Sequence, residues 1–429
     1  MGPQIETVKL TPQVVKLVHD AVDAASSELR RVNLELWNNP EVMFQEVKAC
    51  KLLSNFLESR GWTVKRGVYG LETAFEARIA FVGGGRTVCY NVEYDALPEI
   101  GHACGHNLIA TASLASAIGT AHAMETLGVP GTIVVMGTPA EETGGGKYIM
   151  ANNGAWRDCD VCLMTHAMQD YSTPVLISRA SWKFRATFHG KPSHAAYAPW
   201  NGQNACDAIV MAYNGLACLR QQIQKTETIQ SVILEAGKAP NIIPDYAAGT
   251  YSIRAKDAKA LEALRKRVIP IFEGAAAATG CTVKLYWDAL YEDVITNRVL
   301  ATHYQQDMID HLGMPPDKLL ALDEAFRQDD KAAGSSDFGN CTYIAPGIQA
   351  LFSIDAADMP HTPPFREAAG TQFAHGEALR AGKANALLGL RVLMHEGFFR
   401  QVREEWEATM RGVGGDDEGG GEVVACVSK

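Results

Sequence analysis

The feature that most constrains the fold of this 429-residue chain is the stretch 91–107, which reads NVEYDALPEIGHACGHN. An apolar, strand-like run at residues 87–92 leads into it, and an apolar helical pattern opens at Leu108. The segment between them contains the ligand-type side chains Glu93, Asp95, His102, Cys104 and His106. Carboxylates, imidazoles and a thiol gathered between a strand and a helix are typical of a transition-metal site. The alternative is a loop that holds two histidines and a buried cysteine by chance.

Ligand-type residues also follow other strand-like runs further along the chain. Glu141 and Glu142 follow the run Thr132–Met136, His166 follows Val161–Met164, and His361 follows Ile348–Ser353. In open α/β sheets, ligands bind beyond the carboxyl ends of the strands. One histidine at a strand end is more often structural, but several clusters in one sheet predict a single shared site.

The composition excludes several classes of protein. Apolar residues make up 47% and charged residues 21% of the chain, as in ordinary soluble globular proteins. The formal net charge of −10 argues against nucleic acid or an anionic membrane as a partner, and no apolar run approaches the roughly 18 residues of a membrane span. The N-terminal residues contain no apolar signal core, and the ten cysteines are scattered, which indicates reduced thiols in a cytoplasmic protein.

The length and the order of predicted elements indicate two domains. Strands and helices alternate over residues 1–178 and again over 292–411, as in an α/β domain. Residues 179–291 read β-α-β-β-α-β, the pattern of a ferredoxin-like α+β domain inserted between these two parts. The tail 412–429 is rich in glycine and acids, so we expect it to be disordered.

Four further residues have candidate chemical roles. Of the adjacent carboxylates Glu141 and Glu142, one can bind a metal while the other takes a proton from a metal-activated water; the alternative is a solvated acidic turn. His194 lies in the inserted domain and can donate to a developing oxyanion, or it is an ordinary surface histidine. Arg254 can bind a carboxylate through two hydrogen bonds, or it is a solvated arginine.

Eight short motifs carry a family resemblance. In chain order they are EYDALP, GHACGH, TPAEE, MTH, GKPSHA, NIIPD, SIR and PHTPPF. Together they resemble the aminoacylase and carboxypeptidase family of metallopeptidases over about residues 12–400. Within that family the chain resembles the amino-acid-conjugate amidohydrolases, the hippurate-type hydrolases and above all the Xaa-Arg (β-alanyl-lysine) dipeptidases, which share the EYDALPEIGHACGHN wording.

The resemblance implies a fold and a set of site residues. The fold would be a zinc-peptidase-like α/β/α catalytic domain whose insertion serves as a lid and dimerisation domain. The implied metal ligands are Cys104, His106, Glu142, His166 and His361. Glu141 would be the general base and Asp95 an acid beside the metal, while His102 receives no ligand role. In a homodimer, His194 would reach the partner's active site, and Asn241 and Arg254 would hold the substrate carboxylate or oxyanion.

Three positions depart from the family pattern. Asn107 stands where the amidohydrolase branch usually has Asp, Ala167 where a proline often follows the ligand histidine, and Glu93 where the wider family has a ligand histidine. These departures leave open whether one or two divalent ions bind. The thiolate of Cys104 favours zinc, and manganese remains an alternative because the other four ligands are imidazoles or carboxylates.

The predicted function is hydrolysis of the amide bond of an N-acyl amino acid or dipeptide by metal-activated water. The substrate is expected to be a small molecule that contains an amide bond and a free carboxylate. Two other interpretations keep the same fold: an amide-forming or cyclising biosynthetic enzyme, and a non-catalytic binding relative.

Overall fold

The computed structural model describes residues 8–327 and 334–413, which divide into two compact units. Unit 1 comprises the chain up to Ile177 and the segments that start at Val294 and at Ser336. Unit 2 consists mainly of the segment Ser178–Asp293, and the described residues Gly334 and Ser335 also belong to it. The domain boundaries expected from the sequence fall after residues 178 and 291, and unit 2 begins and ends close to them.

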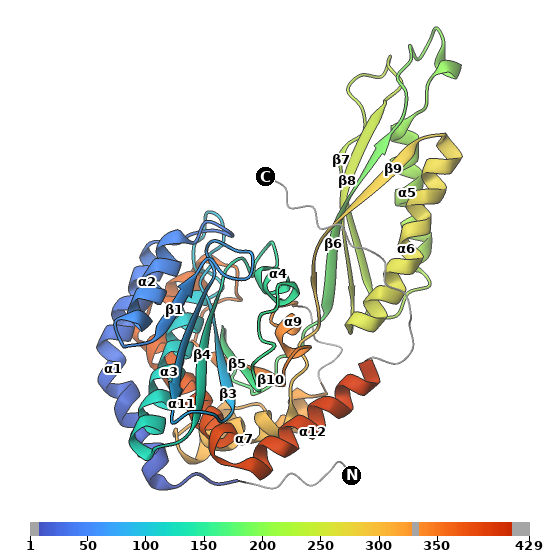
Figure 1. The fold of residues 1–429 in the computed structure, drawn as a ribbon. Coiled ribbons are helices and arrows are strands. Elements are labelled where there is room, and N and C mark those ends of the chain that lie inside the picture. The colour runs from blue at the N-terminus through green and yellow to red at the C-terminus, as the bar shows by residue number, and fades with distance from the viewer. Residues whose placement is uncertain (1–7, 328–333, 414–429) are drawn as a thin grey trace. The chain divides into compact units, whose positions relative to one another are not determined.

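Unit 1 is built on a six-stranded sheet with the order β1-β2-β4-β3-β5-β10 (Figure 1). Its strands are β1 (Thr63–Arg66), β2 (Phe75–Phe81), β3 (Thr87–Glu93), β4 (Gly131–Thr138), β5 (Val161–Met168) and β10 (Gly347–Ser353). The last four of these run parallel, and β1 and β2 are antiparallel to their neighbours. The carboxyl ends of β3, β4, β5 and β10 therefore meet at one edge of the sheet.

Helices cover both faces of this sheet. The described helices of unit 1 are α1 (Pro12–Asn38), α2 (Val47–Glu58), α3 (His106–Leu127), α4 (Gly146–Asn152), α7 (Arg298–Asp310), α8 (Leu322–Ala325), α9 (Gly339–Thr342), α10 (Pro363–Ala369), α11 (Gln372–Met394) and α12 (Glu396–Val413). Alternate residues of β3 separate the two cores: Val88, Tyr90 and Val92 join the core under α1, α3 and α11, whereas Cys89 faces the core near α4 and α9. This is the predicted α/β/α arrangement.

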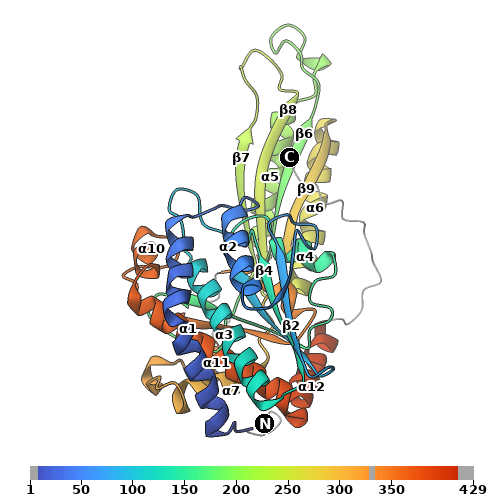
Figure 2. The same ribbon diagram turned by 60° about the vertical axis from the view of Figure 1, so that its left-hand side comes forward.

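Helix α3 lies between α1 and α11 and is buried on almost every side (Figure 2). Helices α3 and α11 approach so closely that Gly382 of α11 has no room for a side chain. A Cβ atom added there would lie 2.6 Å from the carbonyl oxygen of Ala112 in α3. Helix α1 begins with a capped turn, because the Thr11 hydroxyl accepts a hydrogen bond from the Val14 N–H group and Pro12 occupies the first turn.

Unit 2 has the predicted ferredoxin-like order. Its elements are β6 (Ala180–His189), α5 (Ala205–Arg220), β7 (Thr228–Glu235), β8 (Tyr246–Ala255), α6 (Ala258–Thr279) and β9 (Thr282–Tyr291). The antiparallel sheet has the order β7-β8-β6-β9, so β7 is an edge strand. Phe184, Tyr251 and Phe272 stack at the centre of its core, between the sheet and the helices.

Several predicted boundaries differ from the structure. The sequence pattern of residues 373–396 predicts one helix, but α11 ends at Met394 because His395 is extended, and α12 begins at Glu396. The pattern of residues 200–221 also predicts one helix. The structure has a 3₁₀ turn at Pro199–Asn201 and then α5, which starts after Asn204 because that side chain accepts from the Cys206 and Asp207 N–H groups. Helix α12 includes Gly412 and Val413, and the rest of the tail expected to be disordered lies outside the described residues.

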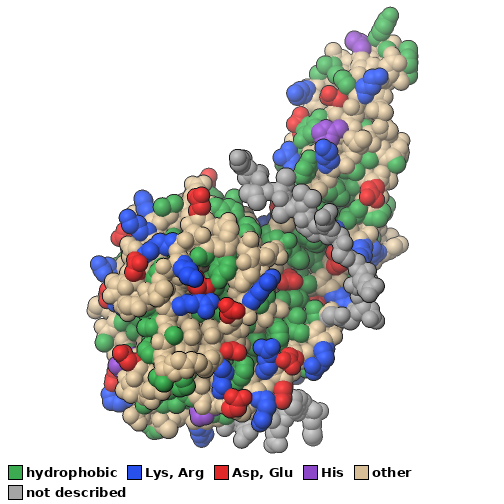
Figure 3. All heavy atoms as spheres, viewed as in Figure 1, with side chains coloured by type: hydrophobic (Ala, Val, Ile, Leu, Met, Phe, Trp, Pro, Cys, Tyr) green, Lys and Arg blue, Asp and Glu red, His purple; other side chains and the backbone are tan. Residues whose placement is uncertain are grey.

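The surface carries charges of both signs. Figure 3 shows Lys and Arg interspersed with Asp and Glu over the visible face, with few regions of a single sign. Among the described helices, none combines the length and apolar character that a membrane crossing requires.

Candidate metal centre and active site

The five predicted metal ligands come together in unit 1, at the carboxyl edge of its sheet. His166 lies in β5, Cys104 and His106 stand at the start of α3, Glu142 follows β4, and His361 follows β10. Their donor atoms form overlapping groups in which all atoms lie within 4.8 Å of one another: Cys104 with His106 and His166, Cys104 with Glu142 and His361, and His106 with Glu141 and Glu142. The sheet topology thus gathers residues that are up to 257 positions apart, from Cys104 to His361.

Two of the histidines are held in the tautomer that a metal ligand needs. Nδ1 of His106 lies 2.8 Å from the carbonyl oxygen of Asp95, and Nδ1 of His166 lies 2.7 Å from that of Ala167. A carbonyl oxygen only accepts, so each ring carries a hydrogen on Nδ1, and in the neutral ring Nε2 presents its lone pair to the site. Backbone or carboxylate acceptors of this kind orient metal-binding histidines in many proteins.

Both Nε2 atoms face other ligand-type atoms. The Nε2 of His166 lies 3.5 Å from the Cys104 sulfur. The Nε2 of His106 is fully buried, has no hydrogen-bond partner among the described residues, and lies 3.7 Å from Oε1 of Glu142. Buried polar atoms are nearly always paired, so lone pairs that converge in this way indicate a cation site. A thiol, three imidazoles and carboxylates make a donor set that suits a divalent transition-metal ion.

His361 completes this set from the loop after β10. Its Nε2 lies 3.3 Å from Oε2 of Glu142, and this hydrogen bond raises the pKa of His361. Its backbone N–H donates to the carbonyl oxygen of Ala103 at 2.9 Å, which ties the loop to the segment next to Cys104. His361 has a left-handed φ of 70°, a conformation that non-glycine residues rarely adopt away from functional sites.

Asp95 holds the ligand-bearing segments in place. Its carboxylate accepts from Nδ1 of His106 at 3.1 Å and from the backbone N–H of Glu142 at 3.0 Å. Burial by itself raises the pKa of Asp95, but the neighbouring His106 and the Glu142 N–H outweigh it and lower that pKa. Asp95 therefore remains ionised and supports two of the proposed ligands.

Glu141 lies at the same centre. Its Oε2 is 3.9 Å from Nε2 of His106, and only 8% of the residue is exposed. Burial, and then the charges of Glu93 and Glu142, raise the pKa of Glu141 well above its usual value. Burial and Glu142 likewise raise the pKa of the Cys104 thiol. The centre thus concentrates negative charge that a divalent cation would offset.

A buried ion cluster behind this centre was not predicted from the sequence. The Lys147 ammonium lies 2.6 Å from Oδ1 of Asp337 and 2.7 Å from Oε1 of Glu93, and all three side chains are fully buried. Burial disfavours the charged form of Lys147 and by itself lowers the pKa. The negative charges of Asp337 and Glu93 outweigh this effect of burial and raise the pKa of Lys147. The other Glu93 oxygen lies 3.6 Å from Nε2 of His106, so the cluster adjoins the proposed ligands. Only spatial proximity reveals it, because its members come from three distant segments.

His102 is buried near the candidate ligands. It is 1% exposed, and burial, followed by the charge of His106, lowers its pKa to about 3. His102 is not a member of any of the three donor groups.

The candidate residues of unit 2 fall into two places. His194 and Asn241 lie side by side, since His194 forms an antiparallel bridge with Ile242 and the Ala195 N–H donates to Asn241 at 3.0 Å. Arg254 pairs with Ser181 near the start of β6, whereas His194 follows the other end of that strand. A ten-residue strand spans about 30 Å, so one copy of unit 2 does not bring Arg254 to His194.

His194 has the tautomer of a hydrogen-bond donor. Its Nδ1 accepts from the backbone N–H groups of Tyr197 at 3.1 Å and Ala196 at 3.3 Å, so the ring hydrogen lies on Nε2. The residue is exposed, and its Nε2–H group is directed by two backbone contacts. This geometry suits donation to a substrate oxygen.

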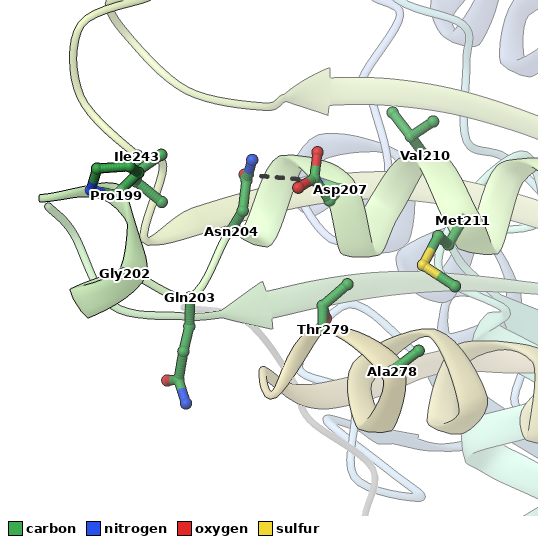
Figure 4. A pocket seen from close by; sticks show the side chains of 10 residues that line it. All are labelled: Pro199, Gly202, Gln203, Asn204, Asp207, Val210, Met211, Ile243, Ala278 and Thr279. Carbon is green, nitrogen blue, oxygen red and sulfur yellow. Dashed lines mark hydrogen bonds between the residues drawn. The ribbon is translucent and has the colours of Figure 1, made fainter. Parts of the chain in front are cut away.

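Unit 2 also has a surface hollow of about 630 Å³ between the N-terminal end of α5 and the C-terminal end of α6 (Figure 4). Asn204, Asp207, Met211 and Thr279 contribute to its lining. Its lining includes no histidine or cysteine, and Asp207 is its only ionisable side chain. The hollow therefore lacks the donor set found in unit 1.

Comparison with known proteins places this geometry in a family. Residues 177–279 match the model of a peptidase dimerisation domain. The Xaa-Arg dipeptidases of Mus musculus and Homo sapiens are 37% and 36% identical to the chain over 404 and 414 residues, and each alignment covers 91% of this chain and 92% of the relative. One subunit of the p-aminobenzoyl-glutamate hydrolase of Escherichia coli is 32% identical over 71% of this chain and 66% of its own length.

Solved structures show the same fold. An aminobenzoyl-glutamate utilization protein from Klebsiella pneumoniae superposes with a TM-score of 0.68 at 16% identity, covering 88% of this chain and 99% of that structure. A dinuclear metal-binding peptidase of the M20 family from Bacillus subtilis superposes with a TM-score of 0.59 at 21% identity, covering 86% and 99%. The predicted fold class and family resemblance are confirmed. The chain belongs to the M20 family of aminoacylase- and carboxypeptidase-type metallopeptidases, in the branch that contains the Xaa-Arg dipeptidases, and is a metal-dependent hydrolase of amide bonds.

Proposed function

We propose that this enzyme hydrolyses dipeptides or N-acyl amino acids with a free carboxylate, with Glu141 as the general base. The observation that carries the assignment is the position of Glu141, 3.9 Å from the unpaired Nε2 atom of His106 and next to Glu142 in the chain. Cys104, His106, Glu142, His166 and His361 would hold the divalent ion. When bound, that ion supplies Lewis acidity, which polarises the scissile carbonyl and acidifies water.

Glu141 moves the proton through the reaction. Its carboxylate takes a proton from the attacking water and passes it to the leaving amine. The side chain is only 8% exposed, so the proton is shielded from bulk water between the two transfers. Glu142, adjacent in sequence but turned toward His361, is assigned to the metal instead.

Zinc is the proposed metal. A cysteine thiolate with three imidazoles is a softer donor set than manganese prefers. The three donor groups share Cys104, His106 and Glu142, and together they supply enough donor atoms for one ion or for two. Elemental analysis of protein purified without chelators, with zinc and manganese measured on the same sample, distinguishes the two metals and gives the number bound per subunit.

The substrate class follows from the named relatives. Two relatives that align over most of the chain are Xaa-Arg dipeptidases, so we propose dipeptides with a basic C-terminal residue as the first substrates to test. A competition screen should include N-acyl amino acids beside these dipeptides. Incubation of the free acid with the amine, followed by a search for amide, tests the biosynthetic direction.

A homodimer would complete the active site. Because His194 and Arg254 lie about 30 Å apart in one unit 2, a substrate that contacts both must receive them from different subunits. Arg254 lies at the end of the sheet where the chain enters and leaves unit 2, since Ser181 pairs with both Arg254 and Tyr291. We therefore propose that the substrate contacts Arg254 of one subunit and His194 with Asn241 of the other.

The edge of unit 2 offers a surface for this dimer. Strand β7 is an unpaired edge on which Val232 and Leu234 are 58% and 56% exposed, and Met211 of α5 is 46% exposed. Exposed apolar edge strands favour pairing with another chain. The cytoplasm is the proposed compartment, because all nine cysteines in the described part of the chain are free.

Glu141→Gln tests the base assignment. The amide keeps the size of the side chain but cannot take a proton, so we expect kcat to fall by about 10²–10⁴-fold with metal content unchanged. Glu125→Gln, an exposed position on α3, is the matched control and should keep full turnover. Turnover of Glu141→Gln within tenfold of the wild type would remove Glu141 from this role.

Hybrid dimers test the contribution of His194 to the partner subunit. His194→Ala and Glu141→Gln homodimers should each be inactive, whereas mixed dimers contain one site with both residues intact. Activity should therefore return on mixing. Mass spectrometry would first show that the subunits have exchanged. If activity still does not return, His194 belongs to the active site of its own subunit.

A further inference from the structure

The loop that carries Glu141 and Glu142 follows a strained backbone path. Ala140 adopts a left-handed φ of 60°, which costs a non-glycine residue on the order of 1–3 kcal/mol. The loop closes tightly on itself: the Gly146 N–H donates to the Ala140 carbonyl at 3.1 Å, and a Cβ atom at Gly146 would lie 1.8 Å from the Pro139 oxygen. Such a conformation persists only when its surroundings hold it.

Glu46 provides one of these external contacts. Its side chain is fully buried, Oε1 accepts from the Ala140 N–H at 3.0 Å, and Oε2 accepts from the Thr73 hydroxyl at 3.0 Å. A buried carboxylate is costly unless its hydrogen bonds are made, and the described structure places no Lys or Arg in an ion pair with Glu46. The hydrogen bonds from Ala140 and Thr73 therefore offset the cost of burying this acid.

Neighbours of Glu46 contact the same loop. The Thr143 hydroxyl lies 2.9 Å from the Met43 sulfur, and a Cβ atom at Gly144 would lie 2.6 Å from the ring of Phe44. Met43 and Phe44 are 40% and 38% exposed, so they are not core residues. Met43, Phe44 and Glu46 therefore each contact the loop. Of these three contacts, only that of Glu46 is fully buried.

We propose that Glu46 is a positioning residue for the metal centre. By holding the N–H group of Ala140, its carboxylate sets the left-handed turn that directs Glu141 and Glu142 toward His106. Glu46 acts through the backbone of Ala140 and is not itself a proposed ligand. This inference rests on the proposed roles of Glu141 and Glu142.

Three substitutions separate the hydrogen bond from the charge. Glu46→Ala removes the acceptor, and Glu46→Asp keeps the carboxyl group but shortens the side chain by one methylene, so neither can hold Ala140 as before. Both should lose about 10–100-fold in zinc affinity and in kcat, with a smaller change in KM. Glu46→Gln can still accept from Ala140 and donate to Thr73, so it should stay within about fivefold of the wild type in both measures. Thr73→Val, which removes only the other contact of Glu46, is the control.

The readouts are zinc affinity by competition with a chromophoric chelator, kcat and KM of the zinc-loaded enzyme, and thermal unfolding. A purely structural role would lower the unfolding temperature of Glu46→Ala but leave zinc affinity and kcat of the folded enzyme unchanged, which would overturn the proposal. Glu46→Gln as defective as Glu46→Ala would also overturn it. Zinc affinity reports on Glu142, so a failure of the base assignment for Glu141 would appear separately, in the Glu141→Gln variant.

Discussion

The carboxylate of Asp95 accepts a hydrogen bond from Nδ1 of His106 across 3.1 Å. Its other oxygen accepts from the backbone N–H of Glu142, so one buried acid supports two proposed ligands from different segments. Asp95→Asn replaces one carboxylate oxygen with an NH₂ group. That group is a donor and cannot accept from His106 or from the Glu142 N–H, so one of the two hydrogen bonds is lost. We expect zinc affinity to fall about 10–100-fold, measured by chelator competition. Unchanged affinity would show that neither ligand depends on Asp95.

The thiol of Cys104 is the second point to test. Cys104→Ser replaces a soft donor with a hard hydroxyl, so we expect less zinc per subunit by elemental analysis, and a relative gain for manganese when both metals are offered. Cys218→Ser, an exposed cysteine on α5, is the control for loss of a thiol. Full zinc content in Cys104→Ser would exclude the sulfur as a ligand.

The buried cluster of Lys147, Glu93 and Asp337 should dominate local stability. Lys147→Met leaves two buried carboxylates without their cation, and we expect unfolding free energy to fall by about 3–5 kcal/mol in urea denaturation. Adding Asp337→Asn should restore part of this loss, because one unpaired charge is then removed. Lys383→Met breaks an ion pair with Asp23, whose side chain is 62% exposed, and should cost about 1 kcal/mol or less. An equal loss in Lys147→Met and Lys383→Met would contradict the expected effect of burial.

His303 predicts a pH dependence of stability away from the metal centre. Its Nδ1 lies 2.9 Å from the Val299 carbonyl, and its Nε2 accepts from the Val8 N–H at 3.2 Å. Burial lowers its pKa from 6.5 to about 4, so the unfolded chain binds the proton more readily than the folded one. The contribution of His303 is complete above pH 6.5 and is lost as the pH falls toward 4.

The comparison variant is His303→Leu, which cannot titrate at this position. Its deficit in unfolding free energy relative to the wild type should be largest at pH 7 and should narrow at pH 5 and again at pH 4. Urea denaturation at each pH provides the measurement. A deficit that stays constant over this range would mean that His303 is protonated equally in both states.

Much of the architecture could be predicted from local patterns. Continuous apolar runs identified β4 and β5, and the β-α-β-β-α-β order of residues 179–291 identified the ferredoxin-like unit, because side-chain periodicity reports directly on burial. The helix boundaries at Met394 and Ala205 were harder to predict from the sequence. The first depends on the extended backbone of His395, and the second on the capping side chain of Asn204.

The proposed ligands were recognisable because their residue types are unusual at strand ends and because eight motifs occur in a familiar order. Glu93, Lys147 and Asp337 were not recognised as a cluster, and Glu46 received no role. Their chemistry depends on contacts across 27 to 190 positions of the chain, which no local pattern reports.

The sequence by itself determined which side chains can bind a metal, the order of the elements and the family resemblance. Only the tertiary structure decided which lone pairs face the centre, because the tautomers of His106 and His166 depend on the carbonyl groups of Asp95 and Ala167. It also decided that Glu93 pairs with a buried ammonium and that Glu46 holds the backbone of Ala140. Hydrogen bonds and ion pairs act over a few ångströms in space, so residues far apart in the chain acquire these roles only when the sheet brings them together.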